Sequence, residues 1–261
     1  MHTQASLLAD LLSFGIPADG TLLVHSSMKA IGSVVGGADT VLDALSQYMA
    51  EGLLVFPTHT WDRINAEQPL YDVRETESCV GILTQLFRKR PGVVRSLHPT
   101  HSVAALGREA AAFIAGDAYL QTPCNRYGPW GRLLDRRATL LFIGVDLTRN
   151  TYMHGVEEWL GIPDNLHSEA EMLFSRDENG TVIPIPQYRH KGDRSEHFGK
   201  VESILLENGA MRMGTFGDAE VRVCDVLRLT EILMVMLQRN PGLFSDARPL
   251  DARLYPMYTR S

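Results

Sequence analysis

Residues 139–158 have the sequence TLLFIGVDLTRNTYMHGVEE, and this stretch decides the fold. Its first part, TLLFIGV, is an unbroken apolar run, which is typical of a strand buried on both faces of a sheet. Turn and N-cap residues follow from Asp146 to Thr151, and the apolar spacing then changes to that of a helix. A buried strand that leads into a helix predicts an α/β protein, whose functional residues lie at the carboxyl ends of its strands.

One face of the predicted helix carries a histidine and two glutamates. A spacing of three residues places Glu157 beside His154, and a spacing of four does the same for Glu158. An imidazole next to a carboxylate can take up and release a proton near neutral pH, because the unperturbed histidine pKa is about 6.5. Such a turn is more often an exposed charged surface, so a functional interpretation needs support from other polar residues.

Three other loops place polar residues beside buried strands. TLLVHSS at 21–27 and EGLLVFPTHTWD at 51–62 flank an amphipathic helix, and this succession predicts a parallel βαβ unit. Together with the stretch described above, the polar loops are HSS at 25–27, PTHTWD at 57–62, HPTHS at 98–102 and NTYMHGVEE at 150–158. Four such loops predict a shared crevice at one edge of the sheet.

The chain of 261 residues shows no internal repeat or linker, and it is long enough for one large domain. The predicted class is α/β, a single domain with a mostly parallel central sheet flanked by helices. Residues 1–160 are expected to form the core that holds the site. Residues 161–261 are expected to form an α+β part of the same domain, with a strand at 181–186, a hairpin at 210–225 and a helix at 226–240.

Composition excludes several classes of function. The chain is 44% hydrophobic and 21% charged with a net charge of −6, which argues against a nucleic-acid-binding protein. No apolar run approaches the length of a membrane span, and we expect a cytoplasmic protein without a membrane partner. The three cysteines are far apart, so neither a disulfide framework nor a zinc knuckle is indicated.

Four motifs, in this order and with about this spacing, resemble the aminoglycoside 3-N-acetyltransferase family, the antibiotic N-acetyltransferases that use acetyl-CoA. The resemblance covers residues 5–165 strongly and the remainder loosely. TPC at 122–124 and SCVG at 78–81 are similar to uncharacterised bacterial relatives of the resistance enzymes. The four motifs are VHSSMKAIGSVVGGADTVLDAL at 24–45, PTHTWD at 57–62, HPTHSVAALG at 98–107 and LLFIGVDLTRNTYMHGVEE at 140–158.

The resemblance implies that residues 1–160 are a cofactor-binding and catalytic core for acetyl-CoA. Gly36 and Gly37 precede a helix, where backbone N–H groups can receive an anion, although the same glycines can simply shape a turn. The acceptor side of the site is expected to include His59, Trp61, Asp62 and His98. The expected cofactor-binding residues are His25, Ser26, Ser27, Ser33, Val34, Gly36 and Gly37, with Ser102 near the thioester.

In this interpretation His154 is the general base, because an amine must lose a proton before or while it attacks a thioester. Glu157 would fix the imidazole tautomer and stabilise the imidazolium. The oxyanion donor stays open between Ser102, Thr151 and a backbone N–H. The partner is a small-molecule amine, either an aminoglycoside or another amine, which the acidic loop at 62–77 could recognise. A homodimer stays open as the assembly.

Three alternatives compete with this interpretation. A metal-dependent hydrolase could use His59, His98, His101 and His154, although His98 and His101 lie in a loop rather than on one helical face. Cys124 could form an acyl-enzyme, or it could be a packed loop cysteine. A CoA-binding relative that acts on a different amine, or on none, is the third alternative.

Overall fold

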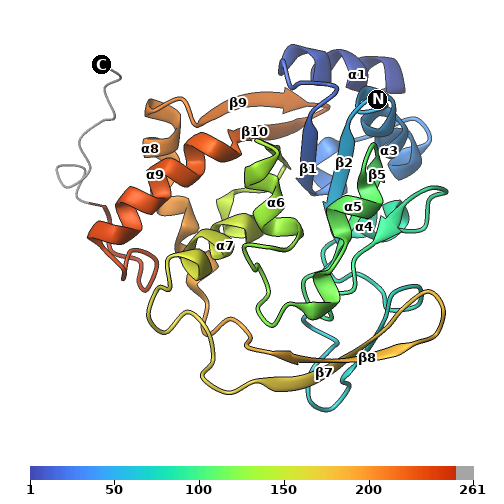
Figure 1. Cartoon of the computed structure of the whole chain (residues 1–261). Coiled ribbons are helices and arrows are strands. Elements are labelled where there is room, and N and C mark those ends of the chain that lie inside the picture. Colours follow the sequence, from blue (N-terminus) through green and yellow to red (C-terminus); the bar gives the residue numbers. More distant parts are fainter. Residues whose placement is uncertain (251–261) are drawn as a thin grey trace.

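The computed structural model describes residues 1–250. A seven-stranded sheet runs through the molecule with helices on both faces (Figure 1). Its strands lie in the order β4-β5-β2-β1-β6-β10-β9. Their bounds are β1 Thr21–Ser26, β2 Leu53–Pro57, β4 Val94–Arg95, β5 Val103–Gly107, β6 Thr139–Ile143, β9 Met211–Phe216 and β10 Ala219–Asp225.

The predicted α/β class and βαβ unit are confirmed. Strand β1 pairs in parallel with both β2 and β6, and helix α3 (Gly37–Tyr48) connects β1 to β2. Antiparallel strands extend the sheet on both sides, through β5 and β4 next to β2 and through β10 and β9 next to β6. The parallel part of the sheet is therefore its centre.

Alternation along the central strands explains their unbroken apolar sequences. In β6, Leu140 and Phe142 face one core, while Leu141 and Ile143 face the other. One face is covered by α1 (Gln4–Ser13), α2 (Met28–Ile31), α3 and α4 (Ile82–Phe87). The other face is covered by α5 (Ala110–Ile114), α6 (Pro129–Asp135), α7 (Thr151–Trp159), α8 (Glu202–Glu207) and α9 (Val226–Arg239).

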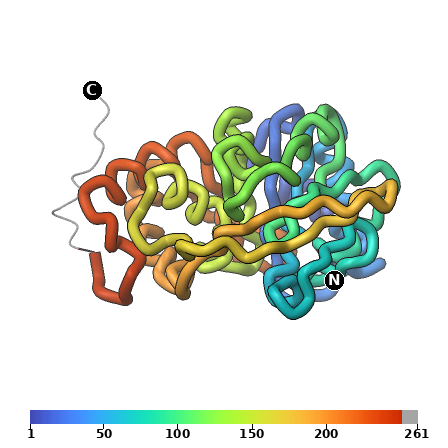
Figure 2. Tube along the Cα trace, turned by 60° about the horizontal axis from the view of Figure 1, so that its bottom comes forward, coloured from blue at the N-terminus to red at the C-terminus, as the bar shows by residue number. Residues whose placement is uncertain are grey.

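A second sheet of three strands, β3 (Leu70–Asp72), β7 (Glu171–Arg176) and β8 (Val182–Gln187), has its own small core around Tyr71 and Leu173. Figure 2 shows the β7–β8 hairpin as a long arm across the molecule. The predicted strand at 181–186 corresponds to β8, and the predicted hairpin corresponds to β9 and β10. Short 3-10 segments occur at η1 (Asp117–Tyr119), η2 (Leu147–Arg149) and η3 (Arg194–Val201).

Strands β9 and β10 join the central sheet next to β6, so the part after residue 160 shares a sheet with the part before it. The acidic segment at 62–77, expected to be a loop, contains the short strand β3, which pairs with β7. No helix in residues 1–250 is long and apolar enough to cross a membrane.

Candidate active site

A pocket of about 730 Å³ opens at the carboxyl ends of β1, β2 and β6. All four polar loops predicted to share a crevice contribute to its wall. Residues within 79–84, and residues within 189–195 after β8, add to the wall. The lining includes His25, Ser26, Ser27, Lys29, His59, Trp61, His101, Arg149, Thr151, His154, Arg189 and His190.

The turn between β6 and α7 aims His154 into this pocket. Strand β6 ends at Ile143, and Gly144 follows with a φ of 64°, where a Cβ atom would lie 2.2 Å from the Cβ of Ala30. Asp146 then caps the η2 turn by accepting a hydrogen bond from the Thr148 backbone N–H. Helix α7 begins at Thr151, so His154 lies on its first turn, at the carboxyl end of β6.

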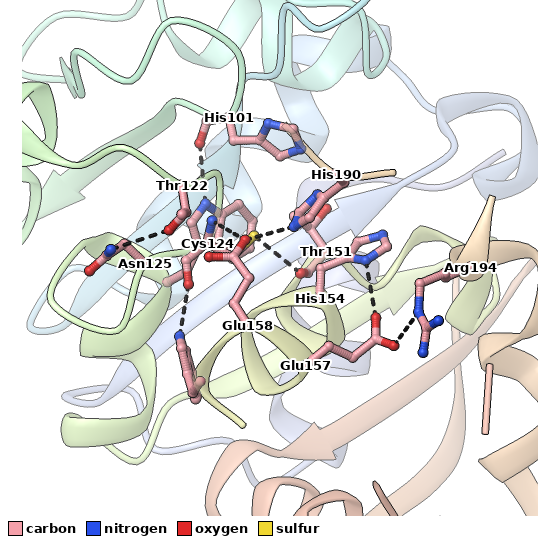
Figure 3. Close-up of polar contacts among 12 residues, drawn as sticks. His101, Thr122, Cys124, Asn125, Thr151, His154, Glu157, Glu158, His190 and Arg194 are labelled. Atoms are coloured by element: carbon pink, nitrogen blue, oxygen red, sulfur yellow. Dashed lines mark hydrogen bonds and ion pairs between the residues drawn. The ribbon is translucent and has the colours of Figure 1, made fainter. Parts of the chain in front are cut away.

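Glu157 lies behind His154, as the helical spacing predicted. Its Oε2 is 3.4 Å from His154 Nδ1, within ion-pair distance but without the alignment of a hydrogen bond. The Glu157 side chain is fully buried, and its Oε1 accepts a hydrogen bond of 2.6 Å from Arg194 Nε. Figure 3 shows the three side chains in a row, with the carboxylate between imidazole and guanidinium.

The imidazole of His154 favours its neutral form. Burial lowers the pKa of His154, and nearby His190 lowers it further, while the Glu157 carboxylate acts in the opposite direction. The ring of His190 stacks on that of His154, with centroids 4.4 Å apart and an interplanar angle of 25°. A neutral imidazole that lines a pocket, with a buried carboxylate behind it, can act as a general base.

Other histidines surround this pair and are also held neutral. Burial lowers the pKa of His59 and His101 well below the usual value, and neighbouring histidines add to the effect. The ring centroids of His59 and His101 are 4.7 Å apart, and His59 Nε2 is 3.0 Å from the Thr151 hydroxyl. His25 stacks on Phe142 at the end of β1, and burial lowers its pKa to about 3.

The four histidines of the hydrolase alternative do not form one ligand set. His98 Nδ1 instead accepts hydrogen bonds from the backbone N–H groups of Thr100 and His101, because the chain turns tightly there. Within residues 1–250, the single group of His, Cys, Asp and Glu close enough to share an ion is Cys124, Glu158 and His190. The hydrolase alternative is therefore unsupported.

The predicted cofactor-binding residues separate into two groups. His25, Ser26 and Ser27 line the pocket, whereas the loop between α2 and α3 does not reach its wall. That loop is held by a hydrogen bond from His2 N–H to Ser33 O and by a bridge between His2 and Val34. Gly36 and Gly37 have φ values of 78° and 65°, so both glycines shape the turn into α3. Contact of this loop with a cofactor stays a prediction.

Among the remaining predicted residues, His59 and Trp61 line the pocket, but Asp62, His98 and Ser102 do not. Ser102 is fully buried, and its hydroxyl donates to Thr58 O at 2.8 Å instead of reaching the pocket. A place for Ser102 near the thioester stays a prediction. Asp62 lies in an exposed ion pair with Arg63.

Cys124 is fully buried, and its thiol lies 3.6 Å from Thr151 O. Burial raises its pKa well above the usual range, and the charge of Glu158 raises it further. A thiol held in its protonated form is a poor nucleophile, which disfavours the acyl-enzyme alternative.

The sequence did not indicate a role for His190 or Arg194. Both lie in the charged segment after β8, where neither spacing nor apolar pattern distinguished them from solvated surface residues. A signal for His190 was present only at its partner. Glu158 shares the helical face of His154, and a buried carboxylate at that position needs a partner, which His190 supplies.

Comparison with known proteins adds the family. A family model described as aminoglycoside 3-N-acetyltransferase matches residues 23–238. The chain belongs to this family. A Bacillus subtilis (strain 168) relative, the SPbeta prophage-derived aminoglycoside N(3')-acetyltransferase-like protein YokD, is 28% identical over an alignment of 251 residues, and the match covers 88% of this chain and 89% of the relative. Aminoglycoside N(3)-acetyltransferase III from Salmonella sp is 29% identical, and the match covers 93% of each chain.

Solved structures share the fold of this family member. The crystal structure of the YokD protein matches with a TM-score of 0.81 and 25% identity, and covers 92% of this chain and 95% of that one. The binary complex of AAC-IIIb with CoASH matches with a TM-score of 0.79, covering 90% of this chain and 96% of that one, at 23% identity. The predicted family and fold are thus confirmed.

Proposed function

We propose that this protein transfers an acetyl group from acetyl-CoA to an amine of an aminoglycoside or a similar compound, with His154 as the general base. One observation carries the proposal: His154 lines the pocket with the buried carboxylate of Glu157 behind it. Family membership supplies the reaction class, which is acyl transfer to nitrogen.

Each residue has a part in such a transfer. As the amine nitrogen bonds to the carbonyl carbon, the neutral imidazole of His154 accepts the proton that the nitrogen loses. Glu157 stabilises the imidazolium that results, and Arg194 holds the carboxylate in place. The proton then passes from the imidazolium to the departing CoA thiolate, which restores neutral His154.

The charge of the lining supports a phosphate-bearing donor. Lys29, Arg149 and Arg189 line the pocket, while no Asp or Glu of residues 1–250 does so. Ser26 and Ser27, at the end of β1, add hydroxyl donors on the same wall. AAC-IIIb, which has this fold, is itself bound to CoASH. These observations favour coenzyme A as the donor.

The acceptor side is expected at His59 and Trp61. Trp61 is 46% exposed and lines the pocket, so it offers an aromatic surface to a sugar or amine. The acidic loop at 62–77 begins directly after it, and its carboxylates would attract a cationic acceptor. Solved neighbours of this fold hold apramycin or sisomicin, which supports an aminoglycoside as the first acceptor to test.

Calorimetric titration of CoA and acetyl-CoA, followed by thiol release with a panel of aminoglycosides and simple amines, tests the proposal. Wild-type protein should bind CoA and release thiol with at least one acceptor. His154→Ala should bind CoA with similar affinity but lose about 10²- to 10⁴-fold in rate, the usual contribution of a general base.

His167→Ala is the matched control, because His167 is exposed and lies outside the pocket lining. It should keep the wild-type rate. An unchanged rate in His154→Ala would remove this residue as the base. Binding of CoA without thiol release would instead contradict the aminoglycoside acceptor and direct the search to other amines.

A further inference from the structure

Three potential metal ligands from segments far apart in the sequence meet beside the pocket, and one of them, His190, lines it. Cys124 lies in the loop before α6, Glu158 lies on α7, and His190 follows β8. One ligand atom of each residue lies within 4.8 Å of the other two. Figure 3 shows the thiol, the carboxylate and the imidazole turned toward one another.

The carboxylate of Glu158 is only half satisfied by protein groups. Its Oε1 accepts a hydrogen bond of 2.8 Å from the Cys124 backbone N–H and lies 2.6 Å from His190 Nε2. Its Oε2 has no hydrogen-bond partner. The side chain is only 4% exposed, so solvent does not satisfy this oxygen either. A buried carboxylate oxygen without a partner is costly, and it indicates a group that the protein itself does not supply.

The surroundings hold the three ligands in place. Trp159 Nε1 donates a hydrogen bond of 2.8 Å to Cys124 O, so the loop that carries the thiol is fastened to α7. The thiol itself has only a long contact of 3.6 Å with Thr151 O, which leaves its sulfur available. Metal sites depend on this kind of outer support, which orients the ligands before the ion binds.

We propose that Cys124, Glu158 and His190 bind one zinc ion. Thiolate, imidazole and carboxylate are the three ligand types that zinc prefers in proteins. Zinc ligands lie about 2.0 to 2.3 Å from the ion, so atoms already within 4.8 Å of one another need only small side-chain rotations to surround it. Cys124 is a protonated thiol without the ion, and zinc binding releases that proton to solvent. The resulting thiolate and the carboxylate balance the two charges of the ion, which limits the cost of burying it.

Three protein ligands leave a fourth position for water or a bound molecule. The site borders the catalytic base, because His190 lines the pocket and stacks on His154. An ion bound there fixes the ring of His190 and joins the loop before α6 to α7 and to the segment after β8. This zinc site differs from the four-histidine set of the hydrolase alternative, and it does not depend on which amine is acetylated.

Metal content and a cobalt titration test the proposal without any activity assay. Untagged protein, purified without chelator, should contain about one zinc per chain by elemental analysis. After the metal is removed, added Co²⁺ should produce a sulfur-to-cobalt charge-transfer band, since cobalt occupies zinc sites and reports thiolate ligation by its colour.

Cys124→Ser and Glu158→Gln should each weaken zinc binding by about 100-fold or more, because loss of even an outer partner typically costs about 10- to 100-fold. The cobalt band should vanish in Cys124→Ser. Cys224→Ala is the matched control, since Cys224 is a buried thiol of β10 outside the cluster, and it should bind zinc like the wild type. Glu158→Gln keeps an oxygen for the Cys124 N–H, so it tests the site even if Cys124→Ser does not fold.

Two results would overturn the proposal. One is wild-type protein that contains no zinc and shows no cobalt band at saturating metal. The other is a folded Cys124→Ser or Glu158→Gln variant that binds zinc as tightly as the wild type. Loss of acetyl transfer with intact zinc binding would contradict the proposed function alone, which keeps the two failures distinct.

Discussion

Arg194 donates a hydrogen bond of 2.6 Å from Nε to the Oε1 of Glu157, and neither side chain is more than 10% exposed. The guanidinium therefore neutralises the carboxylate that faces the base. It also comes from the segment after β8, so residues outside the first 160 complete the site.

Removing this guanidinium should affect both stability and the base. Arg194→Ala leaves the Glu157 charge buried without its main partner, and we expect a loss of roughly 3 to 5 kcal/mol in the free energy of unfolding. The unbalanced carboxylate should also raise the pKa of His154, because it favours the imidazolium. Urea denaturation and the pH profile of kcat/KM measure the two effects.

The control for this variant is Arg63→Ala. Arg63 pairs with Glu77 at 3.1 Å, but both side chains are about half exposed, so solvent screens the pair and its loss should cost less than about 1 kcal/mol. Equal losses from Arg194→Ala and Arg63→Ala would contradict the view that burial makes the first pair important.

The acid limb of the pH profile should depend on Glu157. The base works when neutral, and burial lowers the pKa of His154, so the midpoint of the acid limb that His154 sets in kcat/KM should lie below the ordinary histidine pKa of about 6.5. Glu157→Gln removes the charge that raises this pKa, and the limb should move to lower pH while kcat falls. A limb that stays in place, or moves to higher pH, would show that another group titrates.

Protein stability should fall as the pH drops from 7 to 5. Burial lowers the pKa of His98 to about 3, whereas the unfolded chain binds a proton near pH 6.5. Between about pH 3 and 6.5 the unfolded state binds more protons than the folded state. The free energy of unfolding therefore rises with pH, and this contribution to stability is lost as the pH falls. His98 alone should account for about 2 kcal/mol between pH 7 and 5.

Urea denaturation of His98→Asn at the two pH values checks this contribution. The side-chain oxygen of asparagine can accept hydrogen bonds from the same two backbone N–H groups that donate to His98 Nδ1, but asparagine does not titrate. The difference in stability between pH 7 and 5 should shrink by about 2 kcal/mol. An unchanged difference would assign the acid sensitivity to other groups.

The turn before α3 can be tested for a cofactor contact. In Gly36→Ala, the new Cβ would lie 2.4 Å from the Thr40 hydroxyl at a φ of 78°, so we expect a loss of about 1 to 2 kcal/mol in stability. In Gly37→Ala, the new Cβ has no atom within 4 Å, so only the positive φ of the backbone destabilises this variant. If the loop only shapes a turn, calorimetry should give the same CoA affinity for both variants, whereas a cofactor contact would weaken binding.

The sequence predicted best those features that are local in the chain. The change of period between Ile143 and Thr151 located β6, α7 and the pairing of His154 with Glu157. Strand β3 was missed because its three residues become a strand only by pairing with β7, about 100 residues later. The antiparallel direction of β5 depends likewise on tertiary pairing with β2, which no local pattern records.

The same reason explains which site residues were found. Four polar loops indicated a crevice because each followed or preceded a recognisable buried strand. His190 and Arg194 reach the site through the β7–β8 hairpin, whose path cannot be read from residue spacing. The direction of a side chain at a strand end depends on its neighbours, and the sequence did not record that the hydroxyl of Ser102 donates to Thr58 O.

The register of Val221 opposite Ile143 sets a condition on any hybrid protein built from this chain. A fragment that stops at residue 160 would leave β6, the strand that carries α7, as an open edge with a free row of backbone groups, and such edges invite association between chains. The hairpin β9–β10 acts as the cover of that edge. Exchange of the C-terminal part between relatives should therefore succeed only when the incoming hairpin keeps this register.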